Sequence, residues 1–289
     1  MQFSEKDSIM EAERVIDVIQ EIAPRVYHLD YRVKAPDGAG RVFCFREGKV
    51  LLTRNRQVPT WAQLCGCSIR CRYLFAIDRE EFYLGEPDGP IRAPGLEWMH
   101  RKVLRNLEPL SMAFAGYTAR HLEHWYRDNR FCGRCGGPME PGQDERKVLC
   151  PACGYQVYPR INPAVIVAVH DGDRLLMARY AKRPIPWFVL LAGFVEVGET
   201  AEQCVAREVR EEVGIAVKNI RYYGSQPWGM SGNLTLAYTA ELDGDSQLRV
   251  DRSELAEARW FARHEVPIQH SDRVSITQDM VRAFAQGRF

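Results

Sequence analysis

Apolar and polar positions along this chain follow two different periods, and the changes of period predict where helices and strands lie. Near the N-terminus, apolar residues at Ile9, Ala12, Ile16 and Ile19 have helical spacing, and Pro24 is expected to stop that helix. Short apolar runs separated by Gly and Pro then predict strands at 41–45, 50–53, 72–77 and 81–84. A further helix is expected over 112–128, so residues 1–128 are predicted to form a small α+β domain.

The second half of the chain combines a buried strand with one strongly amphipathic helix. Residues 164–169 form an unbroken, mostly β-branched run, which is typical of a strand covered on both faces, and 174–178 is its predicted hairpin partner. Thr200 and Gln203 form a capping box that predicts a helix start, and Gly214 is placed to end that helix. Its core-facing stripe is Ala201, Val205, Val209 and Val213. Further strands are predicted at 220–223, 234–241 and 258–261, and a last helix at 272–285.

Residues 131–159 are rich in Cys, Gly and Pro and hold two CxxC pairs, Cys132 with Cys135 and Cys150 with Cys153. Two such pairs can close a tetrahedral thiolate site, and four protein ligands leave no open position, so the spacing predicts a structural zinc site. Two disulfides or a redox-active CxxC pair are the alternatives. Cys65, Cys67 and Cys71 fit no standard metal spacing and are expected to be small residues in or beside a strand.

Composition narrows the functional classes. The chain has 46% hydrophobic and 27% charged residues, as an ordinary globular protein does, and a net charge of +1, so no general attraction to nucleic acid is expected. The acidic N-terminus lacks the features of a signal peptide, and no apolar stretch is long enough to span a membrane. These features predict a cytoplasmic location without a membrane partner. The nine cysteines are then best explained as thiols and metal ligands.

The amphipathic helix carries the candidate chemistry. Glu208 and Glu212 are four residues apart and therefore share a face, with Glu211 beside them. Arg207 and Arg210 relieve part of their repulsion, and divalent cations would relieve more. Carboxylate oxygens are the ligands that Mg2+ prefers, and a bound cation can neutralise a pyrophosphate and orient a water. The alternative is a solvated, salt-bridged surface helix.

The spacing Gly193-x5-Glu199-x7-Arg207-Glu208-Val-x-Glu211-Glu212-x-Gly214-Ile215 resembles the box of the Nudix hydrolases at every defined position. Ser225-Gln-Pro-Trp228 and the preceding zinc ribbon are similar to features of the NAD(H) pyrophosphatase subfamily. The resemblance covers roughly residues 120–285. It implies an α+β chain in which an α/β/α Nudix sandwich with a mixed sheet (161–289) follows a zinc ribbon (129–160) and the N-terminal domain (1–128).

The resemblance also implies roles for individual residues. Glu208 and Glu212 would bind catalytic Mg2+ or Mn2+, helped by the backbone carbonyl of Ala192 and by Glu257. Either Glu212 or Glu211 would take or relay the proton. Arg101 is matched only loosely to a substrate-contacting Arg. The implied substrate contacts are Glu145, Tyr158, Phe194, Gln226, Pro227, Trp228, Gly229, Met230, Ser231, Gly232, Asn233 and Thr277.

Two departures from the subfamily pattern affect these expectations. Residues 229–233 (Gly-Met-Ser-Gly-Asn) replace the usual Pro-Phe-Pro and a following Ser, which predicts a more flexible segment and a less strict selection of NADH. Thr277 stands where a small apolar residue is usual. His121 and His124, on the helix predicted over 112–128, are interpreted as surface residues.

The implied activity is metal-dependent hydrolysis of NAD(H) to nicotinamide mononucleotide and AMP, with removal of NAD caps from RNA 5′ ends as a further reaction. The implied assembly is a homodimer, in which the segment 226–233 closes over substrate. One alternative is a Nudix diphosphatase for ADP-ribose, FAD, dinucleoside polyphosphates or coenzyme A derivatives. Another is a non-catalytic RNA-binding regulator that uses the ribbon as a nucleic-acid module, and a third is a ribbon that serves only assembly.

Overall fold

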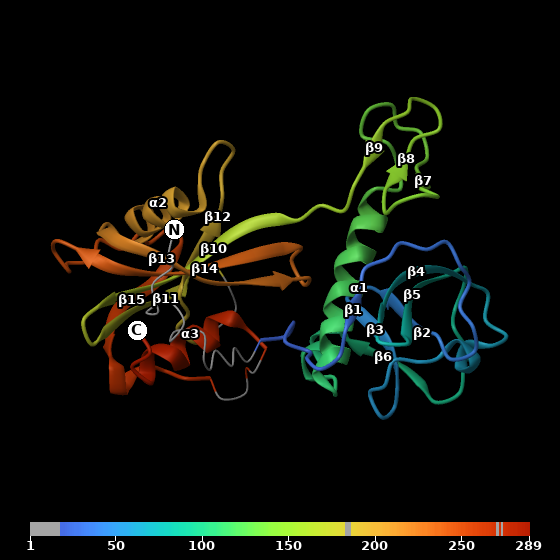
Figure 1. Cartoon of the computed structure of the whole chain (residues 1–289), viewed down its shortest axis with the longest axis horizontal. Coiled ribbons are helices and arrows are strands. Elements are labelled where there is room, and N and C mark those ends of the chain that lie inside the picture. Colours follow the sequence, from blue (N-terminus) through green and yellow to red (C-terminus); the bar gives the residue numbers. More distant parts are fainter. Residues whose placement is uncertain (1–17, 183–185, 270–271, 273) are drawn as a thin grey trace, which may run out of the picture. The chain divides into compact units, whose positions relative to one another are not determined.

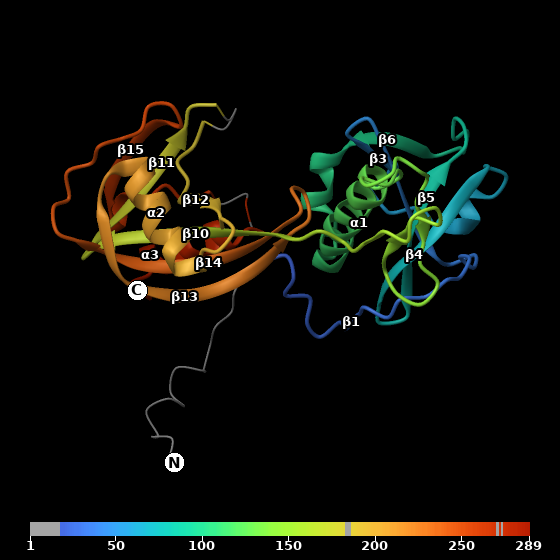
Figure 2. The same ribbon diagram turned by 90° about the horizontal axis from the view of Figure 1, so that it is seen from above.

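The computed structural model describes residues 18–182, 186–269, 272 and 274–289. Most of the helix predicted to begin near Ile9 lies outside these residues. Among the helices that are described, none is long and apolar enough to cross a membrane. The ordering of helices and strands confirms an α+β chain (Figures 1 and 2).

The chain divides into two compact units. The first contains 164–226 and 236–289 together with the described residues up to Glu21, and the second contains 22–163 together with 227–235. The ribbon therefore groups with the N-terminal sheet, and a short hairpin tip from the second half of the chain joins them. The three-part division predicted from the sequence stays a prediction.

The second unit is built on a six-stranded sheet in the order β1-β4-β5-β2-β3-β6. β2 and β5 run parallel, and the other neighbours are antiparallel. The strand bounds are β1 (Tyr27–His28), β2 (Arg41–Arg46), β3 (Lys49–Thr53), β4 (Ile69–Ile77), β5 (Glu80–Pro87) and β6 (Leu96–His100). The four predicted strands are confirmed as β2 to β5, whereas β1 and β6 were not predicted.

Helix α1 (Leu110–Asp128) packs against this sheet and confirms the helix predicted over 112–128. Its Phe114 meets Tyr27 of β1 edge to face, with ring centroids 4.9 Å apart. Two short 3-10 helices, η1 (Trp61–Leu64) and η2 (Arg101–Asn106), connect the remaining strands. Burial of an almost continuous apolar face explains why this long helix is stable here.

One member of the looser cysteine cluster, Cys71, lies beside a glycine of strand β5, across from Cys44. Cys71 of β4 and Cys44 of β2 are both register partners of Gly85 in β5. A Cβ atom at position 85 would lie 2.6 Å from Cys44 Sγ, so Gly85 leaves the space that this thiol occupies. Burial raises the pKa of the Cys71 thiol to about 11. The packing role predicted for Cys71 is confirmed.

The ribbon contains three very short antiparallel strands, β7 (Glu140–Pro141), β8 (Val148–Leu149) and β9 (Gln156–Val157). Both cysteine knuckles have the same backbone geometry. Gly136 N–H donates to Cys132 O, and Gly154 N–H donates to Cys150 O, each at 2.9 Å. Both glycines have a positive φ, 75° and 71°, which explains why glycine follows each pair.

The first unit is a sheet covered by one helix on each face. Its strands are β10 (Asn162–Asp171), β11 (Arg174–Tyr180), β12 (Leu191–Phe194), β13 (Ala216–Trp228), β14 (Asn233–Asp243) and β15 (Leu255–Ala262). Val165, Val167 and Val169 of β10 pack with α2, while Ile166 and Ala168 pack with α3. Alternate residues of one strand thus serve two cores, and the predicted α/β/α sandwich is confirmed.

Helix α2 (Ala201–Val213) begins and ends at the predicted residues. Thr200 Oγ1 accepts from Gln203 N–H, Gln203 Oε1 accepts from Thr200 N–H, and Gly214 ends the helix with φ 73°. Val205, Val209 and Val213 are fully buried. The capping box and the fourfold spacing were therefore sufficient to place this helix.

Helix α3 (Ile276–Ala285) begins later than predicted, and a short 3-10 helix, η3 (Arg263–Glu265), follows β15. The Asp272 carboxylate accepts from Val274 N–H and Ser275 N–H, which holds a turn, and Ser275 then caps the helix. The predicted start at Asp272 is wrong because its side chain bonds the backbone that would have continued the helix.

Candidate active site and zinc site

One arginine neutralises part of the α2 cluster, the four carboxylates that lie on α2 or directly before it: Glu199, Glu208, Glu211 and Glu212. Arg207 donates to Glu199 Oε1 at 2.8 Å, to Glu208 Oε1 at 2.8 Å and to Glu211 Oε2 at 3.0 Å. Arg207 holds the pKa of Glu199 down at about 2. Arg210 is exposed and takes no part in these contacts. One guanidinium against three carboxylates leaves the cluster with excess negative charge.

Glu208 lies against Gly193 of β12, the strand that precedes α2. A Cβ atom at Gly193 would lie 2.0 Å from the Glu208 carboxyl carbon, so the glycine leaves the space that this carboxylate occupies. Burial raises the pKa of Glu208, and the nearby Glu211 and Glu254 carboxylates add to that effect against the opposing Arg207. A half-desolvated carboxylate among like charges is one that a divalent cation would stabilise.

The two remaining box glutamates differ sharply in environment. Glu212 is only 3% exposed, whereas the side chain of Glu211 is 60% exposed. Both lie in the last turn of α2. Any proton transfer through Glu212 would therefore occur in a less hydrated environment than one through Glu211.

The other predicted cation ligands lie on neighbouring strands. Ala192 of β12 donates its N–H to Tyr180 Oη, and its carbonyl accepts from the same hydroxyl, both at 3.2 Å. Glu257 of β15 accepts from Arg179 at 3.1 Å and is partly exposed. Among the described residues, carboxylates do not gather within 4.8 Å in any group of three. The roles of Ala192 and Glu257 stay predictions.

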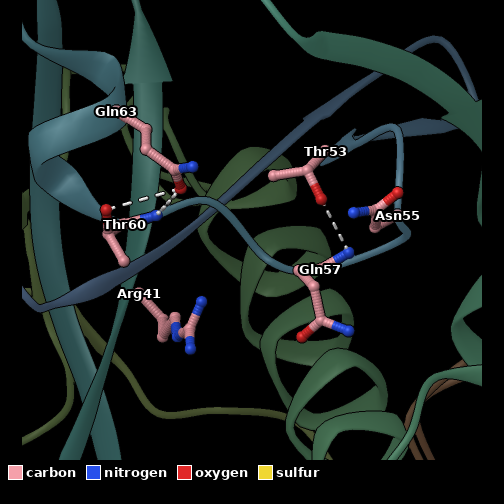
Figure 3. A pocket seen from close by; sticks show the side chains of 6 residues that line it. All are labelled: Arg41, Thr53, Asn55, Gln57, Thr60 and Gln63. Atoms are coloured by element: carbon pink, nitrogen blue, oxygen red, sulfur yellow. Dashed lines mark hydrogen bonds between the residues drawn. The ribbon is translucent and has the colours of Figure 1, made fainter.

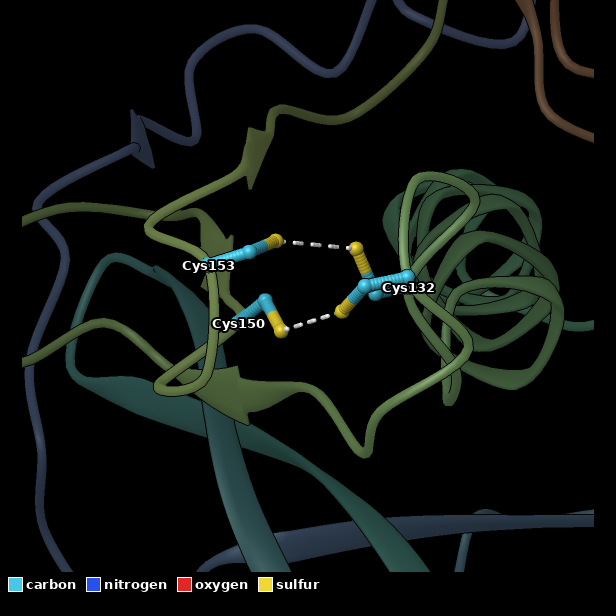
Figure 4. Close-up of side chains that lie close together, drawn as sticks. Cys132, Cys150 and Cys153 are labelled. Atoms are coloured by element: carbon cyan, nitrogen blue, oxygen red, sulfur yellow. Dashed lines mark hydrogen bonds between the residues drawn. The ribbon is translucent and has the colours of Figure 1, made fainter.

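Only the four ribbon cysteines gather that closely in the part of the chain that the structure describes. Cys132 Sγ lies 3.6 Å from Cys153 Sγ, and Cys135 Sγ lies 3.5 Å from Cys150 Sγ (Figure 4). All four are free thiols, so the predicted alternative of two disulfides is not what the fold forms. Four sulfur donors converging on one point are the donor set of a closed zinc site.

The ribbon also brings two predicted substrate contacts together. Tyr158 donates its hydroxyl to Glu145 Oε1 at 2.9 Å, and Lys147 donates to the same oxygen at 2.9 Å. Lys147 and then Tyr158 lower the pKa of Glu145, and the Glu145 carboxylate raises the pKa of Tyr158. Tyr158 is 50% exposed, so its ring is available to a flat ligand.

The predicted substrate contacts Phe194, Thr277 and Arg101 lie on three different elements of the fold. Phe194 ends β12 with 55% of its surface exposed, and its carbonyl accepts from Arg207 at 3.0 Å. Thr277 lies in the first turn of α3, next to Ile276, whose N–H donates to Gln226 Oε1. Arg101 begins η2 and donates its N–H to Gly48 O. Their substrate contacts stay predictions.

Gln226 is 1% exposed, and both ends of its side-chain amide bond to its own chain. Its Nε2 donates to Val274 O at 2.7 Å, and its Oε1 accepts from Ile276 N–H at 2.9 Å. These bonds tie β13 to the start of α3. Gln226 therefore stabilises the contact between β13 and the start of α3, and its predicted contact with substrate stays a prediction.

Residues 227–235 form a hairpin tip that packs against α1 within the second unit. The Trp228 ring meets Tyr117 at 5.1 Å between centroids, nearly edge to face. Gly232 O accepts from Asn162 N–H at 2.9 Å. His121, predicted as a surface residue, is half-buried beside Gly232 and bonds through Nε2 to Arg160 O at 2.8 Å. These contacts hold the tip against α1 in this structure, and the greater flexibility expected from the loss of prolines stays a prediction.

Gly229 lies close against the backbone of α1. A Cβ atom at this position would lie 2.1 Å from Tyr117 O, so only glycine permits the tip to touch the helix backbone. Gly229→Ala is expected to lower the free energy of unfolding by about 1–3 kcal/mol, as overpacking does. Urea denaturation followed by tryptophan fluorescence measures it. Gly89→Ala, where nothing lies within 4 Å, is the matched control, and equal effects of the two changes would contradict the contact.

The second unit also has an open polar cavity of about 520 Å³ (Figure 3). Its lining comes from β2, β3 and the segment up to η1: Arg41, Thr53, Asn55, Gln57, Thr60 and Gln63. Several of these groups bond to one another, with Gln57 N–H donating to Thr53 Oγ1 and Thr60 N–H to Gln63 Oε1. None of the predicted site residues lines it.

Sequence reasoning missed three residues that support the site. Tyr180 holds the Ala192 backbone, Glu199 anchors Arg207, and Lys147 bonds to Glu145. Glu199 stands in the box spacing, so a signal for it existed. Tyr180 and Lys147 belong to no motif, and only folding brings them to their partners.

Comparison with known protein families identifies both the domain that carries α2 and the zinc ribbon. Residues 160–284 match the NUDIX domain, and residues 127–158 match the NADH pyrophosphatase zinc ribbon domain. The second match assigns the four-cysteine cluster as a structural zinc site.

Relatives extend the similarity beyond these two segments. The "NAD-capped RNA hydrolase NudC" of Stutzerimonas stutzeri is 39% identical over 212 residues, which cover 73% of this chain and 76% of the relative. The protein of the same name from Chromobacterium violaceum is 36% identical, covering 78% and 84%. A crystal structure of a NUDIX hydrolase from Nitrosomonas europaea has 24% identity and a TM-score of 0.47, covering 55% of this chain and 92% of that one.

Proposed function

Because this chain belongs to the Nudix hydrolases and carries the NADH pyrophosphatase zinc ribbon, we propose that it hydrolyses the pyrophosphate bond of NAD(H). The products are nicotinamide mononucleotide, oxidised or reduced, and AMP. The observation that carries the proposal is the α2 cluster, in which Glu208, Glu211 and Glu212 lie on one helix and Glu208 lies against the backbone of Gly193 in β12. The relatives named as NAD-capped RNA hydrolases support removal of NAD caps from RNA as a reaction of the same site.

Mg2+ or Mn2+, the cations that Nudix hydrolases use, would neutralise charge on the pyrophosphate and activate a water. We propose that Glu208 and Glu212 hold these cations, with the Ala192 carbonyl and Glu257 as further ligands. The donor set fits, because every one of these groups offers a hard oxygen and the α2 cluster carries excess negative charge. Arg207 keeps Glu208 oriented through its bond at 2.8 Å.

The candidates for proton transfer are the two glutamates Glu211 and Glu212 at the end of α2. Glu212 is buried and Glu211 is exposed, so the two groups differ in how strongly solvent competes for a proton. We assign the general base to Glu212, since its carboxylate is shielded from bulk water and can accept a proton from the attacking water. Glu211 shares Arg207 with Glu208 and thereby adjusts the charge around the site.

The substrate's flat rings require exposed aromatic faces. Two aromatic side chains meet this requirement: Phe194 at the end of β12 is 55% exposed, and Tyr158 in the ribbon is 50% exposed. We propose that Tyr158 and Glu145 contact the nicotinamide end and that Phe194 stacks on a ring of the dinucleotide. Exposed Pro227 and Ser231 are proposed as contacts of the hairpin tip, and Thr277 as a contact from α3.

We also propose that the protein acts as a homodimer in the cytoplasm. Phe131 near the start of the ribbon and Ile161 directly after it are 66% and 59% exposed, as apolar side chains at an association surface are. Thiolate ligands persist in a reducing compartment, which fits a cytoplasmic zinc ribbon.

Product analysis tests the proposed function. Purified protein incubated with NADH, NAD+, ADP-ribose and FAD in Mg2+ or Mn2+ is expected to cleave NADH or NAD+ fastest, with AMP and the mononucleotide identified by mass spectrometry. Faster cleavage of ADP-ribose or FAD would contradict the substrate while leaving the hydrolytic chemistry in place. Tight RNA binding without cleavage of any of the four would favour a non-catalytic regulator.

A further inference from the structure

Lys147 forms a compact charge cluster in the ribbon with two acids. Its ammonium lies 2.9 Å from Glu145 Oε1 and 3.1 Å from Asp144 Oδ2. The Lys147 side chain is 12% exposed, whereas those of Asp144 and Glu145 are 71% and 50% exposed. Because Glu145 Oε1 also accepts the Tyr158 hydroxyl, two hydrogen bonds that share this oxygen connect the ammonium to the exposed tyrosine.

Backbone hydrogen bonds hold the loop that carries Lys147. Gly142 N–H donates to Lys147 O, and Lys147 N–H donates to Glu145 O, both at 2.9 Å. A Cβ atom at Gly142 would lie 2.7 Å from Lys147 Cγ, so the glycine leaves room for the lysine stem. Tyr31 donates its hydroxyl to Gly142 O at 2.7 Å, which anchors the loop to the N-terminal sheet unit. The lysine therefore lies in a hydrogen-bonded loop, with its side chain only 12% exposed.

The cluster has a definite charge because one ammonium faces two carboxylates. With Lys147 present, Asp144, Glu145 and Lys147 together carry one negative charge, and without it they would carry two. NAD+ and NADH differ by one positive charge, and that charge is on the nicotinamide ring. A group that changes the charge beside the ring must therefore change the preference between the two forms.

We propose that Lys147 is a specificity-determining residue that shifts the enzyme toward the reduced, uncharged nicotinamide ring by partly neutralising Glu145. This inference rests on the proposed function, since it takes the ring to lie near Tyr158 and Glu145. Lys147 touches no reacting bond, so its effect falls on the choice of substrate and not on the hydrolytic step.

The test compares kcat/KM for NAD+ and NADH in the full-length, zinc-loaded protein. Lys147→Met keeps the aliphatic stem and removes the charge, and it is expected to raise the ratio of NAD+ to NADH about fivefold, the size of one unit charge across a solvent-exposed contact. Lys147→Arg keeps the charge and is expected to preserve the ratio. Lys218→Met breaks an exposed ion pair with Asp243 on β13 and β14 and serves as the matched control, with no change expected.

The outcomes separate this inference from the proposed function. A ratio unchanged in Lys147→Met, in protein that binds zinc normally and cleaves both dinucleotides, would overturn the role of Lys147 and leave the function standing. An equal shift in Lys218→Met would also overturn it, because the effect would then be one of net charge. Wild-type protein that cleaves neither dinucleotide would refute the proposed function itself.

Discussion

Glu212→Gln is expected to lower kcat by about 10²–10⁴-fold under saturating Mg2+, the range that general acid–base groups contribute. The amide keeps the shape of a side chain that is 3% exposed, so packing around the last turn of α2 is preserved while the proton acceptor is lost. Initial-rate kinetics with NADH over a range of Mg2+ concentrations measure the effect. A rate that recovers at high Mg2+ would instead assign Glu212 to cation binding alone.

Two further changes on the same helix make this result specific. Glu211→Gln is expected to have a much smaller effect, because that side chain is 60% exposed and shares Arg207 with its neighbours. Glu202→Gln removes the same charge from the first turn of α2, where the side chain bonds to Tyr238 at 3.1 Å, and serves as the control. Wild-type turnover in Glu212→Gln would refute the catalytic role.

Both ends of helix α2 could be predicted from local sequence signals. Thr200, Gln203 and Gly214 bond to backbone within their own turns, so the helix ends follow from the sequence alone. The strands around it were found where β-branched residues run together. Strand β12, with Ala192 and Gly193 at its centre, has no such signal, and its identity as a strand depends on pairing with β10.

The candidate site was predictable where a motif fixes residue types and not where folding joins distant segments. The box spacing identified Glu208, but its contact with Gly193 arises from packing of α2 against β12. Gln226 was recognised only as part of a motif, and its burial beneath Val274 and Ile276 depends on the path of a segment about fifty residues later. Asp272 was misassigned because a side chain that can bond its own backbone competes with helix formation.

Zinc is expected to be the main source of stability in the ribbon, because its three strands are two residues each and few apolar side chains are buried there. Structural zinc sites contribute binding energies of about 10–16 kcal/mol, which are then folding energy. Cys150→Ser removes a fully buried ligand and is expected to reduce the zinc content from about one ion per chain to nearly none. Elemental analysis of purified protein measures that content.

Unfolding of the zinc ribbon is expected to weaken substrate binding, because the hydrogen bond between Tyr158 and Glu145 depends on the folded ribbon. The KM for NADH is therefore expected to rise in Cys150→Ser, whereas the α2 cluster lies in the other unit and keeps its own hydrogen bonds. Cys65→Ser, at an exposed cysteine outside the cluster, should leave both zinc content and KM unchanged. Full zinc binding by Cys150→Ser would show that this thiol is not a ligand, and an unchanged KM in zinc-free protein would separate the ribbon from substrate binding.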